Sequence, residues 1–262
     1  MPFDVAAWAP WALEIYAGVL ALLLLATTGG WWLVRRIDVP RDQSSLSPAL
    51  YLGLRLAAGF AVIVTGAWVF AELAEKLGTD GAMGRADQAL ADSLRTQLPP
   101  AALQMFALLT RLADTPTVVG LCILVAAVLV WRGRRWLALG WVLAVAGNGV
   151  LNTTLKQIFA RVRPVHDDGL VLAHGFSFPS GHSSGSVVLY GMLAYVLCRF
   201  VPPRWQLPLV LAAVALAFSV GVSRVFLRVH FASDVLAGFA SGTAWLVVCI
   251  VSIELTRWTR NR

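Results

Sequence analysis

His230 and Asp234 lie four positions apart near the end of the chain, and their side-chain types suit nucleophilic chemistry. On a helix this spacing places both side chains on one face. A carboxylate bonded to one imidazole nitrogen fixes the tautomer and makes the other nitrogen more basic. The pair therefore suits a histidine nucleophile, although a helix-stabilising contact has the same spacing. His182, from a distant segment, is a candidate general acid for a leaving oxygen, with a merely packed histidine as the alternative.

Three basic residues, Lys156, Arg163 and Arg224, stand at the ends of apolar segments in the same half of the chain. The planar guanidinium group matches the oxygens of a phosphate, and lysine adds a point charge. Ser180 and Gly181 stand where a helix is expected to begin, and free N–H groups at a helix start attract anions. Glycine also lets the backbone approach a ligand closely. Together these residues predict a site for a phosphoryl group.

A metal site is not expected. The candidate ligands His166, Asp167, Asp168 and His174 have a spacing that matches no standard ligand set. Three cations already supply the positive charge that a phosphate needs. We therefore expect neither a metal ion nor another cofactor.

The composition is that of an integral membrane protein. Of 262 residues, 58% are hydrophobic and only 13% are charged, whereas soluble domains carry roughly a quarter charged residues. The net charge of +7 lies in short basic groups between apolar runs, which indicates membrane topology and not nucleic-acid binding. Its three cysteines fall within apolar runs and are expected to be packing residues.

Apolar stretches long enough to cross a bilayer, about 20 residues each, predict seven helical spans and an all-α fold. The third is short and is expected to borrow flanking residues. The predicted spans are Trp11–Val34, Ala49–Ala74, Pro116–Trp131, Trp136–Leu155, Ser183–Phe200, Leu207–Val222 and Phe231–Ile253.

The arginines predict the orientation of these spans. Because consecutive spans alternate in direction, four arginine groups fall on one side, which the positive-inside rule makes cytoplasmic. The N-terminus is then outside and the C-terminus cytoplasmic, and the residues with candidate chemistry meet on the outer side. The four groups are Arg35, Arg36 and Arg41; Arg132, Arg134 and Arg135; Arg199 and Arg204; and Arg257, Arg260 and Arg262.

Residues 75–114 lie on the predicted outer side and contain an amphipathic pattern followed by a short apolar segment. We expect a helical hairpin at the membrane surface, with Asp87 away from its apolar face; a lid over a binding site is the alternative. Arg161 and Arg228 are expected to extend to the lipid headgroups. Asn148 and Asn152 are expected mainly to form hydrogen bonds between helices.

Taken together, these residues resemble the type-2 phosphatidic acid phosphatase superfamily, which has three motifs in order. The first, K-x6-R-P, matches Lys156, Arg163 and Pro164, and the second, P-S-G-H, matches residues 179–182. The third, S-R-x5-H-x3-D, matches Ser223, Arg224, His230 and Asp234.

The resemblance implies that His230 attacks phosphorus and forms a phosphohistidine while Asp234 holds its ring. It implies that His182 protonates the leaving group and later activates water. The remaining predicted site residues would stabilise the phosphoryl oxygens without a metal: Lys156, Arg163, Arg224, Ser180 and the Gly181 amide.

The resemblance also implies a domain organisation. Residues 1–48 would form an extra transmembrane helix and a cytoplasmic loop. Residues 49–262 would form the six-helix phosphatase domain, with the catalytic motifs in 156–234.

The expected function is that of a metal-independent lipid phosphate phosphatase in a bacterial cytoplasmic membrane. Outer-side placement favours undecaprenyl pyrophosphate, and the alternatives are phosphatidylglycerol phosphate, phosphatidic acid or lipid A phosphates. A phosphotransferase acting on lipid A, or a transporter of anionic lipids, are further alternatives. The expected partners are a lipid phosphate and the bilayer, not nucleic acid, and the oligomeric state is left open.

Overall fold

The computed structural model describes residues 5–37, 48–77, 81–164, 171 and 173–260. Its regular secondary structure in these ranges is entirely helical, as predicted. Short 3₁₀ helices, η1 (Val5–Trp11) and η2 (Arg111–Ala113), accompany nine α-helices. These are α1 (Ala12–Ile37), α2 (Pro48–Glu75), α3 (Ala82–Gln97), α4 (Pro100–Thr110), α5 (Thr115–Trp131), α6 (Arg135–Phe159), α7 (Gly181–Leu197), α8 (Pro203–Phe226) and α9 (Ala232–Arg260).

All seven predicted spans are helices, with ends that differ from the prediction by at most seven residues. Within the described ranges, α1, α2, α6, α8 and α9 are each long and apolar enough to cross a membrane. The short third span borrows flanking residues, because α4 and α5 meet at a 42° bend and together reach that length. α7 has 17 residues and lies among the spanning helices.

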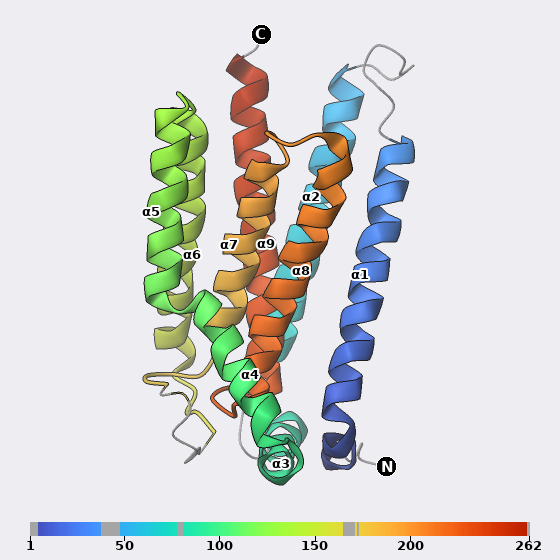
Figure 1. Ribbon diagram of the computed structural model, residues 1–262, viewed down its shortest axis with the longest axis vertical. Coiled ribbons are helices and arrows are strands. Elements are labelled where there is room, and N and C mark those ends of the chain that lie inside the picture. Colours follow the sequence, from blue (N-terminus) through green and yellow to red (C-terminus); the bar gives the residue numbers. More distant parts are fainter. Residues whose placement is uncertain (1–4, 38–47, 78–80, 165–170, 172, 261–262) are drawn as a thin grey trace.

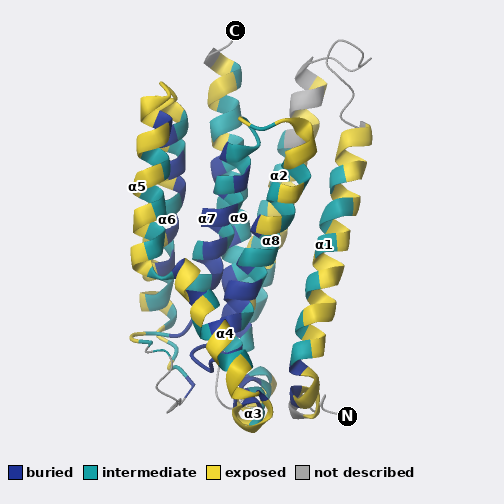
Figure 2. Ribbon diagram, viewed as in Figure 1, coloured by how far each residue is buried: buried dark blue, intermediate teal, exposed yellow. Residues whose placement is uncertain are grey.

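The outer surface of the bundle is apolar, whereas its centre is closely packed. Large apolar side chains such as Leu25 (69% exposed) and Phe60 (66% exposed) point outward, as expected for a surface that faces lipid. Figure 2 shows the buried residues concentrated on α7 and on the ends of α8 and α9 that lie near α4.

Glycines bring α9 close to α7. A Cβ atom at Gly238 would lie 2.6 Å from the Ser180 carbonyl oxygen, and one at Gly242 would lie 2.8 Å from Ser184 Cα. The two backbones are therefore in direct contact, which small residues allow between membrane helices. This contact lies one helical turn from Asp234.

The helix ends that carry the three motifs lie at one end of the bundle, shown at the bottom of Figure 1. The end of α6, the start of α7, the end of α8 and the start of α9 all meet there. The loops that join α5 to α6 and α7 to α8 lie at the opposite end, with the C-terminus. The arginines of these loops are thus far from the motifs.

The segment between the second and third spans forms two short helices, α3 and α4, but the expected surface hairpin is wrong for α4, because α4 joins α5 in the third span. In Figure 1, α3 lies across the direction of the bundle, at the end where the motifs meet. α4 packs along α8 and continues through the bend into α5. The extra helix α1 also packs on α8, where Tyr16 Oη lies 2.7 Å from Ser219 Oγ.

Candidate active site

His230 lies in the short turn between α8 and α9. The N–H groups of Val229 and His230 both donate to the carbonyl oxygen of Arg224, at 3.1 and 3.2 Å. The turn therefore ties the position of the histidine to the end of α8. The side chain of His230 is almost completely buried, with 2% of its surface exposed.

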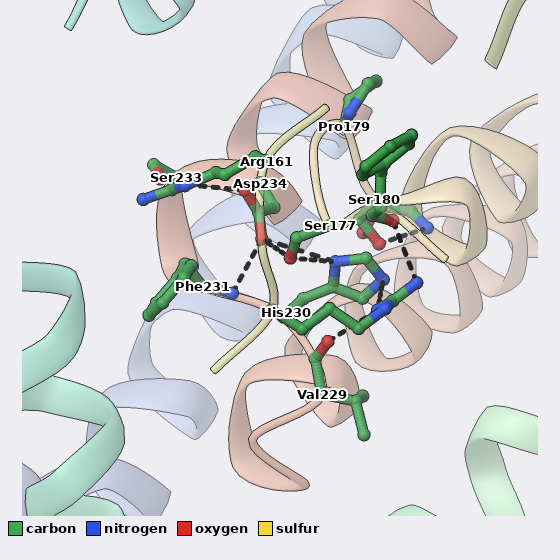
Figure 3. A network of polar contacts seen from close by, with 12 residues as sticks. Arg161, Ser177, Pro179, Ser180, Val229, His230, Phe231, Ser233 and Asp234 are labelled. Carbon is green, nitrogen blue, oxygen red and sulfur yellow. Dashed lines mark hydrogen bonds and ion pairs between the residues drawn. The ribbon is translucent and has the colours of Figure 1, made fainter. Parts of the chain in front are cut away.

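The contacts of the imidazole ring fix its tautomer. Arg163 Nη1 lies 3.0 Å from His230 Nε2, and because a guanidinium group only donates, Nε2 must accept. The ring proton is then on Nδ1, which lies 3.4 Å from Asp234 Oδ2 and 3.3 Å from Ser177 Oγ. Figure 3 shows the ring of His230 beside Ser177 and Asp234. The lone pair of Nε2 therefore points toward the cationic side of the site.

The carboxylate of Asp234 is fully buried and makes several hydrogen bonds. Its Oδ2 accepts from the Ser177 hydroxyl and from the Phe231 N–H at 2.9 Å, and its Oδ1 accepts from Arg161 Nη1 at 2.6 Å. Burial lowers the pKa of His230 to about 3, an effect that Asp234 opposes. The ring is therefore neutral near pH 7, as a nucleophile must be.

Lys156 and Arg163 are held by carbonyl groups of the segment that precedes α7. Lys156 Nζ donates to the Phe176 oxygen at 2.6 Å and to the Ser177 oxygen at 3.2 Å. Arg163 Nε donates to the Gly175 oxygen at 2.9 Å. Because an ammonium group has three donors, Lys156 keeps one that no described residue takes up.

Arg224 is a buried cation, with 3% of its surface exposed. Its Nη1 donates to Thr110 Oγ1 on α4 at 2.8 Å, whereas its Nε has no hydrogen-bond partner among the described residues. Within the same ranges, no carboxylate forms an ion pair with it. A buried charge is stable only when it is compensated, so an anionic ligand suits this position.

Ser180 caps the start of α7 and links it to α9. Its hydroxyl accepts from the N–H of Ser183 at 3.4 Å, and its own N–H donates to the Asp234 carbonyl oxygen at 2.9 Å. At Gly181 a Cβ atom would lie 2.9 Å from Asn152 Oδ1, so a larger residue would displace the Asn152 side chain. The first N–H groups of α7 thus lie directly beside the start of α9.

The asparagines of α6 stabilise this arrangement as predicted. Asn148 Nδ2 and Asn152 Nδ2 donate to Ser184 Oγ of α7 at 3.4 and 3.3 Å. Both asparagine side chains are buried. They act as hydrogen-bond groups between α6 and α7, which brings the end that carries Lys156 beside the start that carries Ser180.

His182 lies in the first turn of α7 and contacts a residue that the sequence analysis did not single out. Its Nε2 lies 2.9 Å from Asp114 Oδ1, at the bend between α4 and α5. With 23% of its side chain exposed, His182 is more accessible than His230. It is therefore well placed to exchange a proton with a ligand or with water.

Two expectations about arginines are wrong. Arg161 was expected at the headgroups but is 12% exposed and forms ion pairs with Asp87 and Asp234. Arg228 was also expected there but is 5% exposed. Two buried carboxylate partners compensate the charge of Arg161 within the site.

Sequence reasoning also missed the residues that contact the predicted site from outside the motifs. Ser177 and Thr110 carry only hydroxyl groups in unremarkable positions, and Asp87 was expected on the exposed part of a surface helix. Asp87 is in fact 6% exposed. The only signal in the sequence for a buried acidic partner was the charge of Arg161, which stands two residues before Arg163. The residues His166, Asp167 and Asp168 lie outside the described ranges.

Comparisons with known proteins identify the family of the chain. Residues 135–258 match the PAP2 superfamily. The chain is 32% identical over 165 residues to phosphatidylglycerophosphatase B of Bacillus subtilis (strain 168), which covers 62% of this chain and 80% of that protein. It is 33% identical over 119 residues to lipid A 1-phosphatase of Rhizobium johnstonii, covering 42% of this chain and 45% of that protein.

A solved structure matches as well. The crystal structure of a transmembrane PAP2-type phosphatidylglycerolphosphate phosphatase from Bacillus subtilis superposes with a TM-score of 0.68 at 30% sequence identity. The match covers 73% of this chain and 96% of that one.

Proposed function

The chain belongs to the PAP2 superfamily and is a multi-pass membrane lipid phosphatase, and we propose that it hydrolyses phosphatidylglycerol phosphate through a phosphohistidine at His230. The observation that carries the proposal is the direction of the His230 Nε2 lone pair, toward Arg163 at 3.0 Å. When a bound phosphate takes over the Arg163 Nη1 donor, the Nε2 lone pair is freed and faces the phosphorus. The names of the relatives support the choice of lipid.

In the first step, His230 Nε2 forms a bond to phosphorus while the bond from phosphorus to the lipid oxygen breaks. His182 donates a proton to that oxygen, which leaves as a hydroxyl group. The ring of His230 gains positive charge, which the carboxylate of Asp234 stabilises. Lys156 and Arg163 stabilise the phosphoryl oxygens, because transfer of a phosphoryl group depends mainly on positioning and electrostatics.

In the second step, water attacks the phosphohistidine. His182 now lacks its proton and accepts one from the water, while the bond from nitrogen to phosphorus breaks. Inorganic phosphate is released and neutral His230 is restored. Arg224 and the Gly181 N–H serve the phosphoryl oxygens in both steps. Ser180, whose own N–H donates to the Asp234 carbonyl oxygen, holds the start of α7 in place beside them. The proposed chemistry uses no metal ion and no other cofactor.

Undecaprenyl pyrophosphate is the second candidate substrate. The arginine distribution predicts that the active site faces outward, which is where that lipid would meet it. A reporter fused in the loop between α6 and α7, and another at the C-terminus, test this orientation. We expect the loop reporter outside and the C-terminal reporter in the cytoplasm of a bacterial host; the reverse result would remove the support for undecaprenyl pyrophosphate.

Phosphate release by the purified protein in detergent with EDTA tests the proposed function. The substrates are phosphatidylglycerol phosphate, undecaprenyl pyrophosphate, phosphatidic acid and lipid A. We expect the highest kcat/KM for phosphatidylglycerol phosphate, and no release by His230→Ala. A ³²P label that stays on the wild-type protein after rapid denaturation, but not on His230→Ala, would identify the intermediate. Release that persists in His230→Ala would refute the mechanism.

A phosphotransferase, which would pass the phosphoryl group to a lipid acceptor such as lipid A instead of water, is the alternative to hydrolysis. Access of water or of a lipid hydroxyl to the phosphohistidine decides between hydrolysis and transfer. The same assay separates them when a lipid acceptor is added, because transfer lowers the yield of inorganic phosphate and labels the acceptor.

A further inference from the structure

A carboxylate that belongs to none of the three motifs lies next to the candidate nucleophile. Asp87 comes from α3, the helix that lies across the end of the bundle, and is 6% exposed. Its Oδ2 lies 2.9 Å from Arg161 Nη2. Asp92, five residues further along α3, is exposed and contacts Gln88 of the same helix. Two similar residues of one helix therefore have different environments.

Arg161 connects Asp87 to the carboxylate that holds His230. Its Nη1 donates to Asp234 Oδ1 at 2.6 Å, while its Nη2 donates to Asp87. The guanidinium carbon also lies 4.3 Å from the centre of the Phe231 ring, which packs against the plane of the cation. Figure 3 shows Arg161 reaching Asp234 on the side away from His230. One planar cation thus bridges two buried carboxylates.

Ser233 ties Asp87 to the start of α9. Its N–H donates to Asp87 Oδ1 at 3.2 Å, and its hydroxyl donates to Asp87 Oδ2. The Ser233 hydroxyl also accepts from Arg161 Nη1 at 2.7 Å. Both oxygens of Asp87 are therefore fixed, and they bind the residue next to Asp234 as well as the cation that contacts it.

We propose that Asp87 and Arg161 are positioning residues for the reaction, and that they orient the Asp234 carboxylate toward His230. The proposal rests on the proposed function. The two oxygens of Asp234 have separate partners: Arg161 contacts Oδ1, and His230 Nδ1 lies 3.4 Å from Oδ2. Arg161 holds Oδ1, and the Ser177 hydroxyl and the Phe231 N–H hold Oδ2, so the carboxylate cannot rotate and Oδ2 stays directed at the ring. The surface helix α3 thereby belongs to the catalytic apparatus.

The charges point to the same role. If Arg161 faced Asp234 alone, its positive charge would neutralise the carboxylate that has to stabilise the ring of His230. Asp87 supplies a second negative charge, so the buried group of Asp87, Arg161 and Asp234 keeps a net charge of −1. That charge favours the step in which the ring gains positive charge.

The test compares Asp87→Asn with Asp92→Asn, the same substitution on the exposed part of the same helix. We expect kcat to fall about 10- to 100-fold in Asp87→Asn, the usual effect of losing a partner of a functional residue. KM should stay within about threefold, because Asp87 does not touch the substrate. Asp92→Asn should match the wild type.

Arg161→Lys provides a second variant that keeps the charge. A single ammonium group cannot bridge both carboxylates as the guanidinium does, so we expect a similar fall in kcat. This variant keeps the proposal testable if Asp87→Asn does not fold. Wild-type kcat in Arg161→Lys would refute the positioning role.

A double-mutant cycle separates positioning from a general structural effect. If Asp87 acts through Asp234, Asp87→Asn should lower kcat little further in an Asp234→Asn background. Equal losses in both backgrounds would overturn the proposal. The ¹⁵N resonances of His230 should also shift in Asp87→Asn without any substrate. That readout stays informative even if phosphatidylglycerol phosphate proves to be the wrong substrate.

Discussion

Replacing Arg224 with glutamine should abolish most activity without destabilising the protein. Arg224 is 3% exposed, and its contact with Thr110 Oγ1 at 2.8 Å is its only side-chain hydrogen bond with a described residue. Glutamine is uncharged and can still bond to that hydroxyl. The variant therefore removes a buried charge that has no carboxylate partner in the described ranges.

The expected size of each effect follows from this environment. Loss of one preorganised donor to a developing oxyanion costs roughly 10²- to 10³-fold in kcat, or about 2.7–4 kcal/mol. Stability should be unchanged or higher, because the effective penalty for burying an ion is several kcal/mol. Arg161→Gln should behave differently, since it leaves Asp87 and Asp234 buried without their shared cation.

The assay pairs phosphate release with thermal unfolding of both variants in the same detergent. Breaking a buried ion pair costs about 3–5 kcal/mol, which lowers Tm by about 6–20 °C in a chain of this size. We expect that fall in Arg161→Gln and none in Arg224→Gln. Orthovanadate, a phosphate analogue, should raise the Tm of the wild type more than that of Arg224→Gln. The reasoning fails if Arg224→Gln unfolds as early as Arg161→Gln, or if its activity stays within about threefold of the wild type.

Three further predictions follow from the site geometry. Because burial lowers the pKa of His230 to about 3, its ring should stay neutral as the pH falls from 7 to 5, whereas an ordinary histidine titrates near 6.5. ¹⁵N NMR of the four histidines measures the protonation of each ring. A titration midpoint near 6.5 for His230 would contradict the prediction. Gly238→Ala places a Cβ atom 2.6 Å from the Ser180 carbonyl oxygen and should lower kcat up to about 100-fold by displacing α9. Gly149→Ala is the control: its added atom meets nothing within 4 Å, so the variant should retain both activity and Tm. Asp114→Asn should lower kcat about 10- to 100-fold by weakening the contact with His182; unchanged kcat would assign Asp114 no part in the reaction.

The sequence predicted the helices and the meeting of the motifs because both depend on local patterns. An apolar run of about 20 residues has few folds available in a bilayer, and alternating spans bring every second helix end to the same side. Lys156, Ser180 and Arg224 could therefore be placed at one end before the structure was known.

The partners of these residues could not be predicted, because they depend on how the helices pack. The sequence of α3 does not indicate which of its polar side chains is buried against the bundle, so Asp87 was expected to be exposed. Likewise, Thr110 contacts the site from the end of α4, and Asp114 contacts it from the 42° bend between α4 and α5. No local sequence pattern predicts this bend or the contact of α4 with α8.

The contact of Gly238 and Gly242 with α7 has a mechanical consequence. When helices tilt to match a thicker or thinner bilayer, α9 turns about the place where its backbone touches α7, and each atom moves in proportion to its distance from that place. Gly238 is four residues from Asp234 and 22 from Arg260, about 6 and 33 Å along the helix. A tilt of about 5° therefore moves Asp234 by about 0.5 Å but the far end of α9 by about 3 Å. The two glycines thus form a pivot, and the carboxylate of Asp234 lies close to it. We therefore expect similar kcat in bilayers of different thickness. A steep dependence of kcat on thickness would contradict this pivot.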